Sequence, residues 1–216
     1  MAVKATYHHG DLRNALLDAA DELLQREGLQ GFTLRACARL AQVSHAAPKH
    51  HFGDVNGLLR AVAERGYARL VEQLETHIEA VRGDLQEEMF ATARGYVTFA
   101  EEYPEHFRIM FRSDLMSFDM SCPPESVAAT FTALTNVILR QRGEAEIKLE
   151  DMPGIRSQAL VNDILIGWCN VHGYAHLRLE GQLASMVPEE DHLAQLRTAS
   201  FRLSELIQNA SRDAKN

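Results

Sequence analysis

The chain has 216 residues and a formal net charge of −8, with 46% hydrophobic and 24% charged residues. This length permits one large domain or a small domain joined to a larger one, and the composition allows a substantial buried core. No apolar run reaches the roughly 18 residues of a membrane-spanning helix, and the N-terminus lacks a signal-peptide apolar region. We therefore expect a cytoplasmic protein with no membrane partner.

The first elements along the chain are three helices. Apolar residues at helical spacing predict a helix over about residues 11–27, ended by Gly28 at a C-terminal cap position. A short helix capped by Thr33 follows, and then a tight turn and a second short helix that we expect Ser44 to cap and Phe52 to end. Two short helices with a tight turn form the helix-turn-helix unit, whose second helix enters the major groove of DNA.

This pattern alone fits a plain helical hairpin about as well as a DNA-binding motif. The small residues favour the motif. Ala38 and Ala41 would let the two helices approach closely, and Ala46 and Ala47 would keep the second helix slim enough for a groove.

The rest of the sequence also predicts helices, and no strand-like alternation stands out. A long helix over about residues 54–81 would link the first part to the remainder. Further helices are expected over 85–102, from Pro104, and over 125–140, 155–181 and 189–210. Residues 116–124 and 143–154 are expected to be loops.

Three segments of the first sixty residues resemble the TetR (tetracycline-repressor-like) family of one-component transcriptional regulators. They are YHHGDLRNALLDAADELLQREG at 7–28, GFTLRACARLAQVS at 31–44, and His51-Phe52 followed by an acidic residue and Leu58-Leu59. Further on, EYPEHFRIMF at 102–111 and GWCNVHGYAHL at 167–177 resemble one subgroup, which has a Trp-His-Gly element in its C-terminal domain.

The resemblance implies an all-α protein in two domains. Residues 1–53 would form a three-helix DNA-binding domain with the helix-turn-helix, and residues 54–216 a larger helical domain for effector binding and dimerisation. The implied function is that of a DNA-binding regulator, most often a repressor, which a small apolar effector releases from a palindromic operator.

The resemblance also places the DNA contacts. Ser44, His45 and Ala46 begin the recognition helix, where the family meets base edges. Lys49 stands where the family usually has a tyrosine that contacts phosphate, and it could still make a charge-assisted contact. His50 and His51 follow and would reach the DNA backbone. The predicted DNA-binding residues are Thr33, Ser44, His45, Ala46, Lys49, His50 and His51.

The acidic net charge at first argues against a DNA-binding protein. Residues 1–60 carry seven basic and six acidic groups, a balance of +1, so the remainder carries −9. Half of the ten histidines also lie in this first part. We expect weak, salt-sensitive non-specific binding to DNA.

Aromatic and methionine side chains suggest an adaptable apolar effector pocket, although the same residues are more often plain core. The predicted pocket residues are Phe107, Met110, Phe111, Trp168 and His172, with Met116, Phe118 and Met120 nearby in the sequence. His172 could equally be a satisfied core histidine.

The last two helices suggest a homodimer. In the last one, apolar or small residues step by three and four from Leu193 to Ala210, which is a heptad-like seam. The resemblance favours pairing with a second copy, and the alternative is packing inside one subunit. The predicted interface residues are Leu160, Ile164, Leu193, Leu196, Leu203 and Ile207.

An enzyme is disfavoured because no GxSxG, HExxH, GxxxxGKS or GxGxxG motif occurs, so we expect no catalytic residue and no cofactor. Cys37, Cys122 and Cys169 are widely spaced and show no metal or disulfide signature. A metal- or redox-sensing regulator of the same fold remains the alternative function, although we expect no metal site.

Overall fold

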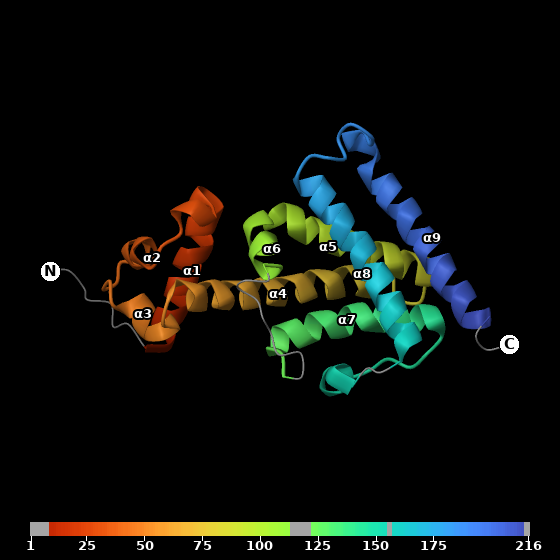
Figure 1. The fold of residues 1–216 in the computed structure, drawn as a ribbon, viewed down its shortest axis with the longest axis horizontal. Coiled ribbons are helices and arrows are strands. Elements are labelled where there is room, and N and C mark those ends of the chain that lie inside the picture. Colours follow the sequence, from red (N-terminus) through yellow and green to blue (C-terminus); the bar gives the residue numbers. More distant parts are fainter. Residues whose placement is uncertain (1–8, 113–121, 155–156, 214–216) are drawn as a thin grey trace. The chain divides into compact units, whose positions relative to one another are not determined.

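The computed structural model describes residues 9–112, 122–154 and 157–213 of the chain, and all regular structure in these ranges is helical (Figure 1). The prediction of an all-α fold is therefore confirmed. The α-helices are α1 (His9–Glu27), α2 (Leu34–Leu40), α3 (Ala47–Phe52), α4 (Val55–Glu79), α5 (Leu85–Glu102), α6 (Pro104–Met110), α7 (Glu125–Arg142), α8 (Gln158–Leu179) and α9 (His192–Asp213). Short 3₁₀ helices occupy Leu29–Gly31 (η1), Leu149–Gly154 (η2) and Glu189–Asp191 (η3).

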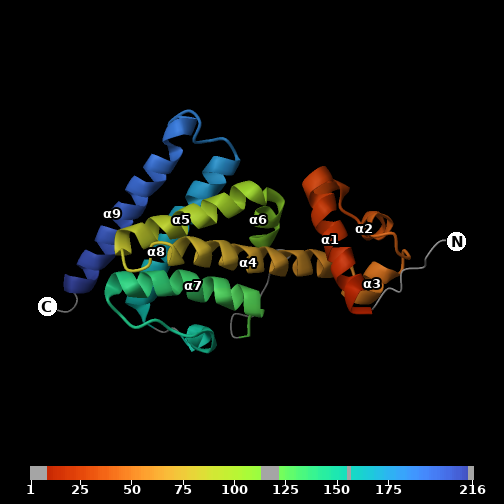
Figure 2. The same cartoon turned by 180° about the vertical axis from the view of Figure 1, so that it is seen from behind.

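The chain divides into two compact units. Unit 1 comprises residues 1–66 and 105–117, and unit 2 comprises residues 67–104 and 118–216. The helix α4 contributes its first half to unit 1 and its second half to unit 2, and α6 belongs to unit 1 from Glu105 onward (Figures 1 and 2). The functional domain limits of 1–53 and 54–216 stay a prediction.

Apolar periodicity located the helices of both units well. Helix α5 begins and ends at the predicted residues because Asp84 caps it, accepting hydrogen bonds from the backbone N–H groups of Gln86 and Glu87 at 3.2 and 3.1 Å. The helix predicted over residues 54–81 corresponds to α4, and its apolar stripe is buried throughout; the stripe consists of Leu58, Leu59, Val62, Tyr67, Leu70, Leu74 and Ile78. Most of the predicted loop 116–124 lies outside the described residues.

Several glycines of unit 1 lie very close to neighbouring atoms, and at one of them two helices meet. A Cβ atom on Gly66 of α4 would lie 2.6 Å from the sulfur of Met110 on α6. Such a distance is far below van der Waals contact, so α4 and α6 pack here only because the side chain is a hydrogen. Met110 itself is almost completely buried.

Unit 2 is built around α5. This helix packs against α7, α8 and α9, and α7 in turn packs against α8 and α9. The side chains of Tyr96, Phe99, Leu196 and Ile207 are among those fully buried. Figure 2 shows these helices from the side opposite to Figure 1.

The end of α2 shapes the turn of the helix-turn-helix. The N–H of Val43 donates to the carbonyl of Ala38 at 3.0 Å, and the N–H of Gln42 donates to that of Arg39 at 3.2 Å. This pair of bonds is a Schellman motif, which needs a left-handed residue between helix and turn. Gln42 takes that conformation with φ of 55°, although glycine adopts it with less strain.

The start of the second motif helix differs from the prediction. Ser44 does not cap it: α3 begins at Ala47 and its N-cap is Ala46, which makes no side-chain capping bond. The reason is Pro48, which has no N–H to donate to the carbonyl of Ser44. That carbonyl instead accepts from the N–H of Ala47 at 3.0 Å, so residues 44–46 form a turn before the helix. The cap predicted at Thr33 is confirmed, since its side chain accepts from Ala36 N at 3.1 Å.

We predict that Gln42→Gly raises the free energy of unfolding by a few tenths to about 1 kcal/mol, because glycine removes the left-handed strain while the unfolded chain gains some entropy. Gln42→Val should lower it, because a β-branched side chain fits this conformation worse. Urea denaturation followed by circular dichroism measures both effects. Equal stabilities of the Gly and Val variants would contradict the assignment of strain to this position.

Candidate functional site

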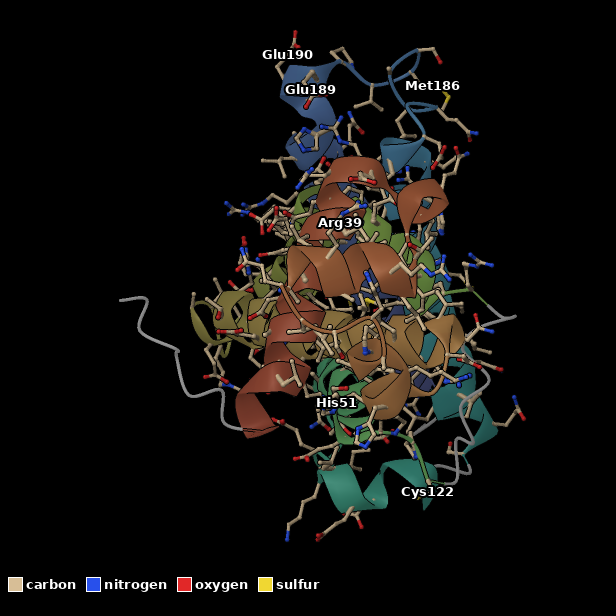
Figure 3. All side chains as sticks on the ribbon, turned by 90° about the vertical axis from the view of Figure 1, so that its left-hand side faces the viewer. Arg39, His51, Cys122, Met186, Glu189 and Glu190 are labelled. Carbon is tan, nitrogen blue, oxygen red and sulfur yellow. The ribbon has the colours of Figure 1, made fainter. Side chains whose placement is uncertain are left out.

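The residues predicted to face DNA are accessible in unit 1. The side chains of Thr33, Ser44, His45, Ala46, Lys49 and His50 are exposed, and His51 is half-buried. Arg39 of α2 and His51 of α3 are both seen on the side of unit 1 that faces the viewer in Figure 3. A ligand can therefore reach each of these side chains, and their roles toward DNA stay a prediction.

The helix α3, which carries Lys49, His50 and His51, packs against the other helices of unit 1. Pro48 at the start of α3 is buried, and α2, which packs against both α1 and α3, buries Cys37 and Ala38 completely. At the other end of α3 the guanidinium of Arg13 from α1 lies 5.3 Å from the centre of the Phe52 ring, within cation–π distance. The exposed polar side chains thus project from a helix fixed at both ends.

The helix-turn-helix is more positively charged than residues 1–60 as a whole, whose net charge is +1. No acidic residue occurs between Glu27 and Asp54, whereas this stretch holds Arg35, Arg39 and Lys49. All three cations are exposed, and none forms an ion pair with another described residue. The acidic groups of the first part lie on α1 and at Asp54, so the motif itself is a cationic surface suited to an anionic ligand.

A buried polar cluster braces unit 1 behind this surface. Asp21 of α1 bonds His106 Nε2 of α6 at 2.9 Å, and its other oxygen accepts from Arg65 of α4 at 3.1 Å. Arg65 also donates to Asp18 at 2.6 Å. Asp21 and His106 are both buried. Together with Arg65 they connect α1, α4 and α6 through directional hydrogen bonds, which fix the arrangement of the helices more specifically than apolar packing does. The sequence gave no signal for this cluster, because its members are separated by up to 85 positions.

Unit 2 contains a narrow cavity among α5, α7, α8 and α9. The volume that a water-sized sphere can occupy inside it is about 40 Å³, and the total space not filled by atoms is about 560 Å³ when the open mouth is included. The wall is mainly apolar and includes Met89, Phe131, Leu134, Ile164, Trp168 and Leu203. None of its lining residues, all of which belong to the described part of the chain, carries a charge.

Two hydroxyl groups of the cavity wall already donate hydrogen bonds within the protein. The hydroxyl of Thr92 donates to the carbonyl of Glu88 at 2.7 Å, and that of Ser200 donates to the carbonyl of Leu196 at 2.8 Å. Both bonds stay within one helix. A wall of this kind suits a neutral, largely apolar molecule, because a charged ligand would lose its hydration without gaining a partner.

Only one of the five residues predicted for the effector pocket lines this cavity. Trp168 lies in its wall, and its ring meets that of Phe131 edge-on at 5.4 Å. Phe107, Met110 and Phe111 belong to unit 1, where the rings of Phe107 and Phe111 contact each other at 5.1 Å. Phe107 and Met110 are buried in the core of unit 1. The clustering of aromatic and methionine residues in the sequence therefore did not indicate which residues line this cavity. Met116, Phe118 and Met120 lie outside the described residues.

His172 takes part in a hydrogen-bonded chain next to the cavity. The Tyr96 hydroxyl lies 2.9 Å from His172 Nδ1, and Trp168 Nε1 donates to the same hydroxyl at 3.4 Å. Burial, followed by the nearby ring of His176, lowers the pKa of His172 to about 4, and burial raises the pKa of Tyr96. A neutral His172 accepts from Tyr96 at Nδ1 and carries its own proton on Nε2. The chain holds Trp168 in one orientation at the cavity wall.

The three cysteines differ in their burial. Cys37 is fully buried in unit 1, and burial raises its pKa to about 11, which leaves the thiol protonated and poorly nucleophilic at neutral pH. Cys122 and Cys169 are exposed. Among the described residues, no three histidine, cysteine, aspartate or glutamate side chains gather in a way that could hold a metal ion.

Four of the six residues predicted for the dimer interface are buried within their own protomer. They are Leu160, Leu196, Leu203 and Ile207, while Ile164 lines the cavity and Leu193 is exposed. The heptad-like spacing of α9 correctly indicated a buried stripe. It could not tell which helices cover that stripe, and here they are α5 and α7 of the same chain.

A different set of apolar residues on α8 and α9 is exposed. On α8, Cys169 lies four positions after Leu165 and therefore on the same face, and Ile166 and Leu177 are exposed on the same helix. The exposed fractions of Leu165 and Ile166 are both 46%, and that of Leu206 on α9 is 55%. The connection between the two helices, with Met186, Glu189 and Glu190, projects into solvent (Figure 3).

A cationic helix-turn-helix in one unit and an uncharged cavity in another define the class of one-component regulators, in which the same chain binds DNA and a small molecule. Residues 16–62 match the family described as bacterial regulatory proteins, tetR family, and residues 89–201 match the tetracyclin repressor-like C-terminal domain. The second match covers more than half of the chain, and the chain belongs to the TetR family. Members of this family are transcriptional regulators and not enzymes.

The curated proteins that match this chain have low sequence identity to it and match only about half of it. The uncharacterized HTH-type transcriptional regulator YobS of Bacillus subtilis (strain 168) is 25% identical over 52% of this chain and 61% of its own length. The HTH-type transcriptional regulator BetI of Rhizobium meliloti (strain 1021) is 30% identical over 54% of this chain and 47% of its own. The chain thus spans about half the length of these curated relatives.

Among solved structures, a protein of unknown function from Rhodococcus sp. RHA1 is similar over 96% of this chain and 98% of its own, with a TM-score of 0.67 and 27% identity. The similarity therefore extends through both units of the fold. No helix in the described part of the chain combines the length and apolarity needed to cross a bilayer.

We predict that the free energy of unfolding decreases as the pH falls from about 6.5 toward 4, and that His172→Gln makes this decrease smaller. The folded-state pKa of His172 is lowered to about 4 from an ordinary value of 6.5, so the unfolded chain binds the proton more readily in this window. Glutamine keeps an acceptor for Tyr96 but does not titrate. Denaturation curves at several pH values measure the effect, and parallel pH profiles of the two proteins would contradict it.

Proposed function

We propose that this protein is a DNA-binding transcriptional regulator, acting as a repressor that a small, uncharged and largely apolar effector releases from a palindromic operator. The observation that carries the proposal is the acid-free helix-turn-helix with its exposed α3, in a chain that belongs to the TetR family. A regulator of this kind works where the DNA is, and we place it in the cytoplasm.

The DNA-binding role assigns α3 to the major groove. Base edges would meet the turn just before α3, where His45 is exposed and can donate or accept a hydrogen bond. Lys49 would contact a phosphate, and the hydroxyl and first N–H groups at Thr33 would contact another at the start of α2. Phosphate contacts position the protein, and base contacts select the sequence.

The effector role falls to the cavity of unit 2. Its uncharged wall selects neutral molecules, and Trp168 offers an aromatic surface for them to pack against. The helix α4 has residues in both units, so a change in unit 2 can be passed to unit 1 through a continuous helix. Effector and DNA would then weaken each other's binding by the same factor, since coupling between two sites is reciprocal.

We further propose that two copies pair through α8 and α9. The exposed stripe with Leu165, Ile166, Leu177 and Leu206, together with the exposed Leu193, is apolar surface of these helices that the protomer itself does not cover. A two-fold pair presents two copies of α3, which suits half-sites about 34–36 Å apart on a palindromic operator.

Selection of tight-binding duplexes from a random pool tests the DNA-binding function. We expect the recovered sequences to share an inverted repeat whose halves lie one or two helical turns apart. Recovery of no preferred sequence, together with no binding to any duplex at low salt, would refute the function.

The effector coupling is tested with a neutral apolar compound that binds the protein, identified by its stabilisation of the fold in a thermal screen. Its dissociation constant, measured by calorimetry, should weaken by roughly 5–150-fold in the presence of saturating operator. An unchanged constant would show that the cavity does not control DNA binding.

The dimer is tested by Ile166→Asp, which places a charge in the proposed interface. Sedimentation at micromolar concentration should give a dimer for the wild type and a monomer of about 24 kDa for the variant. Leu149→Asp is the matched control, because Leu149 is comparably exposed but lies on η2. Leu203→Asp is unsuitable, since Leu203 is buried in the protomer and its charge would unfold the chain. A wild type that sediments as a monomer, or an Ile166→Asp variant that stays dimeric, contradicts the interface.

A further inference from the structure

The helix-turn-helix carries as many histidines as permanent cations. Arg35, Arg39 and Lys49 supply three positive charges at any physiological pH, and His45, His50 and His51 add three imidazoles. His45 and His50 are exposed and His51 is half-buried, so solvent protons reach all of them. Imidazole is the side chain whose charge ordinarily changes near neutral pH.

The surroundings of these histidines favour an anionic ligand as the partner of the protonated form. No acidic residue of α2, α3 or the turn between them competes for the proton. Of the neighbouring elements, α1 contributes Arg13 next to Phe52, α2 contributes Arg35 and Arg39, and Asp54 precedes α4. The other charged groups of α1 are Asp11, Asp18, Asp21, Glu22, Arg26 and Glu27, and the first half of α4 carries Arg60, Glu64 and Arg65. Asp54 accepts from the N–H of Gly57 at 2.8 Å and thereby caps α4.

The rings themselves form a small group. The centres of the His50 and His51 rings are 5.3 Å apart, and that of His51 lies 6.3 Å from the Phe52 ring. Two neighbouring imidazoles that both become charged repel each other in the free protein. A phosphate placed against them removes that repulsion and stabilises both charges.

We propose that DNA binding by this protein takes up protons at His45, His50 and His51, so that these imidazoles act as pH-dependent DNA contacts, His50 and His51 to phosphates and His45 at the base edges. The inference rests on the proposed DNA-binding function of unit 1. Full protonation would raise the positive charge of the motif from three to six, a large change for a chain whose net charge is −8. Affinity for any duplex therefore rises as the pH falls through the neutral range.

The salt dependence provides an independent signature of the same event. Each cation that neutralises a phosphate on duplex DNA steepens the plot of log K against log salt by about 0.9. The slope therefore becomes steeper as the pH falls, by about 0.9 for each imidazole that becomes a phosphate contact. A pH effect on the fold alone would change the affinity without changing the slope in this way.

The experiment measures binding to a fluorescein-labelled 30-base-pair duplex of arbitrary sequence, by anisotropy, at pH 8.0, 7.0 and 6.0 and at several salt concentrations. A charge-assisted hydrogen bond corresponds to roughly a tenfold gain in affinity. We expect the wild type to bind at least tenfold more tightly at pH 6.0 than at pH 8.0, with a steeper salt slope. The variant with His45→Gln, His50→Gln and His51→Gln together should lack this gain, so that its affinity at pH 6.0 equals its own affinity at pH 8.0.

Two controls separate this effect from general ones. Lys49→Gln should weaken binding by a similar factor at every pH, because lysine stays charged throughout the range. His77→Gln removes a histidine from α4 in unit 2 and should leave the gain intact. Circular dichroism at pH 6.0 and 8.0 verifies that each variant is folded.

The outcomes are distinct. A wild type whose affinity does not change between pH 8.0 and 6.0, or a triple variant that keeps the full gain, overturns the inference and leaves the DNA-binding function standing. Absence of binding to this duplex and to duplexes recovered by selection, at every pH, overturns the proposed function itself.

Discussion

The buried carboxylate of Glu88 holds unit 2 together. One of its oxygens accepts from the N–H of Gly83 at 2.7 Å and the other from Arg140 Nε at 2.5 Å, and Arg140 also reaches Glu146 at 3.0 Å. The carboxylate is almost fully enclosed, so loss of Arg140 would leave a buried charge uncompensated at a cost of about 3–5 kcal/mol. This ion pair ties the turn before α5 to α7. It thereby fixes the first turn of α5, and the following turns of this helix carry Met89, Thr92 and Ala93 of the cavity wall.

The two units use opposite chemistry for their candidate ligands. Unit 1 concentrates basic groups and histidines in one stretch without acids, while the cavity of unit 2 has no charged lining residue. The remainder of the chain is strongly acidic. Such a distribution confines attraction for polyanions to the helix-turn-helix and keeps non-specific association elsewhere low.

The sequence predicted the helices well because their signals are local. Asp84 and Pro104 mark the limits of α5, and Thr33 caps α2 as expected. The error at Ser44 was also local: the missing N–H of Pro48 outweighed a good capping side chain. Spacing identified a buried stripe on α9 but not its neighbours. The resemblance supplied the family, which is confirmed, and the prediction of which residues face DNA; periodicity could have named neither.

Contacts between distant positions escaped prediction. Asp21 and His106 are 85 residues apart, and Tyr96 and His172 are 76 apart, so neither pair leaves a pattern in a single sequence. The assignment of Phe107 and Met110 to the pocket failed to match the cavity for the same reason. Aromatic residues mark apolar surroundings but not which core they fill. Only the folded arrangement shows that Trp168 and the aromatics near residue 110 serve different units.

The position of Trp168 has an optical consequence. It is the one tryptophan of the chain, it lines the cavity, and its ring is held by Phe131 and by the Tyr96 hydroxyl. All indole fluorescence of the protein therefore originates at the cavity wall. Because indole emission shifts with the polarity around the ring, the unlabelled protein reports through its own spectrum whether water or an apolar molecule occupies the space beside that ring.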